Sequence, residues 1–205
     1  DVILSFEKPY HFIDFETSAV AIPFHKNRFP YESVAFQYSY HLLDQDKIEH
    51  KGEYINTNIE FPNYEFLRSL KNEFSTSLKG TIFRYHNHEN TILNKIYIQL
   101  LNESSIEFPD RNELIDFIKE ISQPTQINKG EWKPTKNNMV DLYKLILSLY
   151  YSPYSKGSNS IKHILPSVIN DSSFLKSKYS KPIYGTDQIP SKNFINHSWL
   201  NEKEL

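Results

Sequence analysis

The stretch "YHFIDFETS", from Tyr10 to Ser18, predicts a buried strand that ends in two acids. Side chains alternate between the faces of a strand, so Asp14 and Glu16 share one face. Two residues of strand separate their Cα atoms by about 6.5–7 Å. Desolvated carboxylates need a counter-charge, and Mg²⁺ or Mn²⁺ favours such oxygen ligands. The pattern predicts a hard-metal site, unless the strand ends at Phe15 and leaves Glu16 simply solvated.

Hydrophobic periodicity along the rest of the chain predicts one α/β domain over residues 1–205. A strand comes first, then a hairpin of two strands, a helix, a strand, two helices, and a strand running into a helix. This order indicates an antiparallel meander followed by parallel crossovers, which gives a mixed sheet flanked by helices. Ribonuclease H-like folds are built in this order. The predicted strands are 10–16, 34–43, 47–56, 80–86 and part of 137–146, and the predicted helices are 63–78, 89–104, 111–122, the end of 137–146, and 158–169.

The composition excludes several classes of site and partner. The chain has no cysteine, so disulfides, thiolate zinc sites and cysteine nucleophiles are excluded. No apolar run approaches the roughly 20 residues that span a membrane, and we expect no membrane partner. A net charge of −2 does not indicate a nucleic-acid binder, although the region 151–192 carries more lysines than acids. Because the chain starts on Asp1 and ends on "SWLNEKEL", we interpret it as a piece of a longer cytoplasmic protein.

A third acid follows the fourth predicted strand. The stretch "GTIFRYHNHENTIL" (80–93) predicts strand, turn and helix, with Glu89 at or near the helix N-terminus. The helix dipole favours a carboxylate there, and Asn87 is a candidate cap. If the strand at 80–86 lies beside a central strand at 10–16, Glu89 reaches the face that holds Asp14 and Glu16. Taken alone, Glu89 is equally an ordinary first-turn acid.

Several of these stretches resemble a known superfamily. "FIDFET" (12–17) resembles the first motif, Asp-x-Glu-Thr, of the DnaQ-like (DEDD) 3′–5′ exonucleases of the ribonuclease H superfold, and "YHNHENTIL" (85–93) stands where that superfamily carries its second acid. The longer stretches 13–41 and 157–169 are similar to a bacterial domain family of unknown function predicted to be nuclease-like. The resemblance covers most of residues 10–169.

The resemblance implies two-metal phosphodiester hydrolysis at a single-stranded 3′ end of nucleic acid. Asp14 would bridge two Mg²⁺ or Mn²⁺ ions, and Glu16 and Glu89 would each hold one. Thr17, Ser18 and Asn87 would contact the terminal nucleotide. The phosphates would be contacted by Lys156 and Lys162.

The chain departs from the superfamily pattern in two respects. Glu89 stands where the classical exonucleases have Asp, so the carboxylate reaches one methylene further. The final Asp of the superfamily, on a late helix after a His or Tyr, is expected in a segment that this chain lacks. Asp141, in "MVDLYKL" (139–145), is the only late candidate ligand. Its place at the end of the fifth strand also fits a structural role.

Two other functions remain open from the sequence. One is a non-catalytic nucleic-acid-binding module with a degenerate nuclease fold. The other is a zinc or iron site at "HNHE" (86–89), supplemented by the scattered His11, His25 and His41. The His-Glu-x-x-His helix signature of metal hydrolases is absent, which weakens the second alternative.

Overall fold

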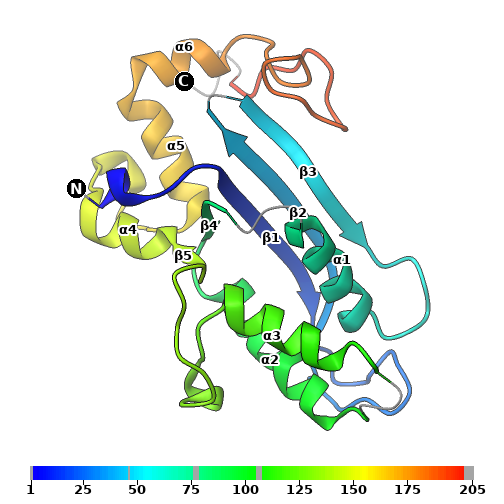
Figure 1. The fold of residues 1–205 in the computed structure, drawn as a ribbon. Coiled ribbons are helices and arrows are strands. Elements are labelled where there is room, and N and C mark those ends of the chain that lie inside the picture. The colour runs from blue at the N-terminus through cyan, green and yellow to red at the C-terminus, as the bar shows by residue number, and fades with distance from the viewer. Residues whose placement is uncertain (1, 46, 76–78, 105–107, 201–205) are drawn as a thin grey trace.

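A computed structural model describes residues 2–45, 47–75, 79–104 and 108–200, and its centre is a five-stranded mixed sheet. The strand order is β3-β2-β1-β4-β5 (Figure 1). β1 pairs antiparallel with β2 and β2 with β3, whereas β4 runs parallel to β1 and to β5. The arrangement confirms the α/β, ribonuclease H-like mixed sheet. The strands are β1 (Tyr10–Ser18), β2 (Val34–Asp44), β3 (Lys47–Ile55), β4 (Thr81–Arg84) and β5 (Val140–Asp141).

Helices flank this sheet. One layer contains α1 (Asn63–Ser75), α2 (His88–Asn102) and α3 (Arg111–Ile121), with α1 against β2 and β3 and α2 against β1 and α3. The others are α4 (Leu142–Leu149), α5 (Ile161–Asp171) and α6 (Ser173–Tyr179), and α4 and α5 lie near the β5 edge (Figure 1). Among the described residues, no helix is both long and apolar enough to cross a membrane.

The two faces of β1 differ in burial as the alternation predicts. His11, Ile13 and Phe15 are buried, and Ile13 and Phe15 join a core that includes Phe66, Leu67, Leu70, Leu93 and Ile96 from α1 and α2. Phe12, Asp14 and Glu16 point to the other face and are exposed. Burial of one face fixes the strand register, because a slip by one residue would bury both acids. The shared face of Asp14 and Glu16 is confirmed.

The last third of the chain contains more helix than its sequence predicts. α5 runs through Pro166 to Asp171, although a proline inside a helix removes one backbone hydrogen bond. The following residues, predicted to be loop, form α6. Ser172 caps α6, because its side chain accepts a hydrogen bond from the Leu175 N–H at 3.2 Å. This cap is the local signal that the sequence reading overlooked.

Candidate metal centre

Asp14 and Glu89 line one cavity on the exposed face of β1, next to β4. Its volume is about 350 Å³. Asp14 comes from the middle of β1, and Glu89 comes from the first turn of α2. β4 lies parallel to β1 and leads directly into α2, which carries Glu89 to the Asp14 face. The predicted proximity of these two acids is therefore confirmed. The lining also contains Phe12, Ile13, Ser39, His41, Phe83, Arg84, Tyr85, Leu142 and Ile161.

Glu89 is the most perturbed carboxyl of the site. The residue is 3% exposed, and its Oε2 atom has no hydrogen-bond partner. Burial, and to a smaller extent the negative charge of Asp14, raise the pKa of Glu89 to about 7. Its own backbone N–H, the Arg84 charge and the Phe15 backbone N–H oppose the rise. A buried carboxyl oxygen without a partner, beside a second carboxylate, is an environment that a divalent cation would stabilise.

Glu16 does not line this cavity, although it is exposed on the same face of β1 as Asp14. The ladder between β1 and β2 shifts directly after it, because Glu16 pairs with Gln37 and Thr17 pairs with Ala35. Such a bulge bends and twists the strand locally. A role for Glu16 as a metal ligand therefore stays a prediction.

Asp141 is held by contacts with β4, with the turn between β4 and α2, and with α4. It pairs in register with Arg84, and Arg84 Nη1 lies 3.1 Å from Asp141 Oδ2. Both side chains are at most 5% exposed. The Asp141 Oδ1 atom accepts hydrogen bonds from the backbone N–H groups of His86 (2.9 Å) and Tyr143 (3.1 Å). The second of these bonds makes Asp141 the N-cap of α4. These contacts use both carboxyl oxygens in holding β4, the β4–α2 turn and α4 together, so we omit Asp141 from the proposed metal ligands.

The predicted substrate contacts Thr17, Ser18 and Asn87 lie in or next to the two elements that carry the acids. The Thr17 hydroxyl lies 3.3 Å from His88 Nε2 and joins the end of β1 to the start of α2. Ser18 pairs with Val34 in the ladder. Asn87 occupies the N-cap position of α2 without a side-chain cap bond. Instead, its Oδ1 atom accepts from Arg84 at 3.2 Å.

A second cavity, of about 560 Å³, adjoins the first. Tyr85 and Ile161 line both, and the Tyr85 hydroxyl donates a hydrogen bond to the Asn159 carbonyl. The predicted phosphate contacts, Lys156 and Lys162, are exposed and flank the segment Gly157–Ile161 that lines this cavity. Neither lysine is itself part of the lining. Their proposed contacts with phosphate stay predictions.

The histidines named for a transition-metal site do not gather at one point. His11 is buried in the core and hydrogen-bonded to the Tyr40 hydroxyl at 2.6 Å. His25 contacts the Ile59 carbonyl, and the ring of His86 packs against Tyr143. In the described part of the chain, no group of three or more His, Asp or Glu side chains is arranged to hold a metal ion. The acidic pair is thus an incomplete centre by itself.

Sequence reasoning did not place the other polar lining residues at this cavity. Ser39 pairs with Asp14 across β1 and β2, and His41 pairs with Phe12, so both stand on the face of the acids. Arg84 enters from β4 as the buried partner of Asp141. The alternation of polar side chains at Gln37, Ser39 and His41 was the available signal.

The family comparison gives one match. A family model described as "Domain of unknown function (DUF2779)" matches residues 11–160. That range runs from β1 to the residue before α5 and includes Asp14, Glu16, Glu89 and Asp141. Searches of curated proteins and of solved structures gave no match.

Proposed function

We propose that this chain, which belongs to the family described as domain of unknown function DUF2779, carries the metal centre of a nuclease of the 3′–5′ exonuclease kind. The single observation that supports this function most is the environment of Glu89. Its buried Oε2 lacks a partner, and the carboxyl lines one cavity with Asp14. A stable fold seldom keeps such an arrangement without a ligand.

The donor set suits Mg²⁺ or Mn²⁺, because carboxylate oxygens are the ligands that hard cations prefer. Asp14 and Glu89 would hold the ion, with Glu16 as a further oxygen donor on the rim. When bound, divalent ions activate water and stabilise the charge that develops during phosphodiester hydrolysis. Thr17, near the end of β1, and His88, at the start of α2, are in contact beside the acids, where they would orient the terminal nucleotide.

Single-stranded nucleic acid is the proposed substrate. The cavity beside the acids continues toward the segment Gly157–Ile161, and exposed lysines stand on both sides of that segment. Lys156 and Lys162 would contact the phosphate backbone in this position. The end of a nucleic-acid strand that follows this path would lie at the Asp14–Glu89 cavity.

A second candidate function is nucleic-acid binding without cleavage. It is favoured by the lack of a ready three-ligand group among the described residues. This candidate predicts binding of single-stranded oligonucleotides that does not depend on divalent metal and is unchanged by Asp14→Asn. The lysines, rather than the acids, would then determine affinity.

A cleavage assay separates the two candidates. The protein is incubated with an oligonucleotide labelled at its 5′ end, in Mg²⁺, Mn²⁺ or EDTA. The proposal predicts metal-dependent shortening from the 3′ end. It also predicts that Asp14→Asn and Glu89→Gln reduce the rate at least about 100-fold, the order of effect of losing a transition-state electrostatic contact.

The matched control is Asp116→Asn, an exposed acid on α3 outside both cavities. It removes one carboxylate charge and should leave the rate unchanged. Equal cleavage by wild type and Asp14→Asn would overturn the proposal. Binding without cleavage would establish the second candidate instead.

A further inference from the structure

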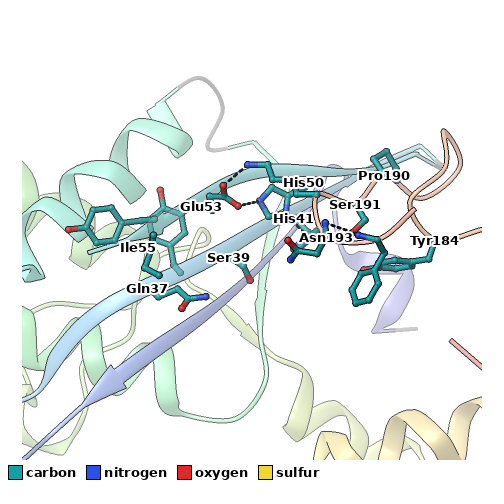
Figure 2. Close-up of a pocket in the computed structure, with 14 residues that line it drawn as sticks. Gln37, Ser39, His41, His50, Glu53, Ile55, Tyr184, Pro190, Ser191 and Asn193 are labelled. Atoms are coloured by element: carbon teal, nitrogen blue, oxygen red, sulfur yellow. Dashed lines mark hydrogen bonds and ion pairs between the residues drawn. The ribbon is translucent and has the colours of Figure 1, made fainter. Parts of the chain in front are cut away.

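Two histidines from neighbouring strands meet on the exposed face of the sheet, and one of them, His41, also lines the cavity of the acids. His41 lies on β2 and His50 on β3, and they pair in register. His41 Nε2 and His50 Nδ1 share a hydrogen bond of 3.2 Å, and the two rings are nearly perpendicular at 86°. Figure 2 shows both rings beside Glu53 in a cavity of about 400 Å³.

A β-bulge creates this pairing. Tyr40 pairs with Gly52, but the next residue, His41, pairs with His50, so Lys51 is the extra residue of β3. In a regular ladder Lys51 would stand opposite His41. The bulge therefore replaces a lysine with an imidazole as the neighbour of His41. Bulges often redirect a side chain at a functional position.

Glu53 stands beside the second imidazole. Its Oε2 atom lies 2.9 Å from His50 Nε2, although the two atoms do not make a regular hydrogen bond. The other carboxyl oxygen, Oε1, accepts a hydrogen bond from Lys192 Nζ at 2.6 Å. A carboxylate at Nε2 favours the proton there and leaves the Nδ1 lone pair directed toward His41. Histidines that bind metals commonly have such a carboxylate on the other ring nitrogen.

The separation of the two ring nitrogens, 3.2 Å, is close to that of two nitrogen ligands on one tetrahedral ion. Zn²⁺ binds imidazole nitrogen at about 2.0–2.1 Å, and the tetrahedral angle then places two nitrogens about 3.3–3.4 Å apart. We propose that His41 Nε2 and His50 Nδ1 form a binding site for Zn²⁺ beside Glu53, with ligands that differ from the acids of the proposed nuclease centre. Imidazole nitrogens favour Zn²⁺ over Mg²⁺, so the two sites select different ions.

Two protein nitrogens leave two tetrahedral positions open. Water fills them, or the oxygen atoms of Ser39 and Asn193, which line the same cavity. Lys192 Nζ is paired with Glu53 Oε1 at 2.6 Å, so this carboxylate balances the lysine charge. Asn193 and Lys192 belong to the segment after α6, which crosses this end of the sheet (Figure 1). Zinc would therefore also fix that segment against β3.

Calorimetric titration with ZnCl₂ in a large excess of Mg²⁺ tests this site. Wild type is expected to bind one zinc ion. Glu53→Gln should weaken the affinity about 10–100-fold, and His41→Gln and His50→Gln, which remove direct ligands, should each weaken it at least as much. His163→Gln, an exposed histidine on α5, is the matched control and should bind zinc as wild type does. Circular dichroism checks that each variant is folded.

A spectroscopic readout accompanies the titration. Co²⁺ bound in a tetrahedral site absorbs visible light strongly, and that absorption should appear in wild type and be lost in both histidine variants. Asp14→Asn should bind zinc normally, which separates this site from the acids. Zinc affinity unchanged in His41→Gln and His50→Gln, or lost in Asp14→Asn, would overturn the proposal.

Discussion

Asp14 of β1 and Glu89 of α2 line one cavity, and burial together with the charge of Asp14 raises the pKa of Glu89 to about 7. The Glu89 carboxyl would be stabilised by a proton at low pH or by a cation at high pH, because either reduces the charge buried beside Asp14. The same relationship therefore predicts both a pH dependence and a metal dependence of stability.

In EDTA, the stability of the chain should fall as pH rises from about 4.5 to about 7. Glu89 has an ordinary pKa of 4.5 unfolded and about 7 folded, so the folded state binds more protons in this window. The loss approaches about 3 kcal/mol above pH 7. Urea denaturation of wild type and Glu89→Gln at pH 5 and pH 8 measures it. The wild type should lose more stability than the variant, and identical losses would contradict the assignment.

Mg²⁺ should stabilise the folded chain through the acids. A ligand that binds only the folded state at 100 times its Kd adds about 2.7 kcal/mol. Thermal denaturation at pH 8 should show a higher Tm with Mg²⁺ than with EDTA. Asp14→Asn and Glu89→Gln should abolish that difference, whereas Asp116→Asn should retain it. A Mg²⁺ effect that survives in Asp14→Asn would place the ion elsewhere.

Removing Asp141 should destabilise the fold strongly. Arg84 and Asp141 are both almost fully buried, so Asp141→Ala leaves an uncompensated charge and costs about 3–5 kcal/mol. The comparison is Glu113→Ala, which breaks the exposed pair with Lys71 and should cost less than about 1 kcal/mol. Urea denaturation measures both. An equally small effect in the two variants would argue against the structural role of Asp141.

Gly80→Ala should destabilise the chain more than Gly130→Ala. Both glycines have positive φ, of 98° and 90°, so an alanine costs about 1–2 kcal/mol of backbone strain at either position. At Gly80 the added Cβ would also lie 2.0 Å from the Pro9 carbonyl oxygen, whereas nothing lies within 4 Å at Gly130. The difference in urea midpoint isolates the clash. Equal midpoints would show that β4 shifts freely away from Pro9.

The sequence by itself determined the sheet and the face of the acids. Alternation at Ile13, Asp14, Phe15 and Glu16 separates a core face from an exposed face, and one-sided burial permits no other register. The order of strands and helices predicted that β4 lies beside β1 and brings Glu89 to Asp14. These properties follow from local periodicity and from the few ways of connecting neighbouring strands.

Only the tertiary structure decided which partners each charged side chain has. Asp141 is paired with Arg84 because β4 and β5 align in register, and His50 faces His41 because a bulge shifts β3 by one residue. Contacts between strands depend on register and on bulges, which single-strand periodicity does not encode. The extent of Glu89 burial likewise depends on how closely α2 packs against β1. That packing depends on many residues that are distant in the sequence. The burial of Glu89 therefore could not be predicted from the residues around it.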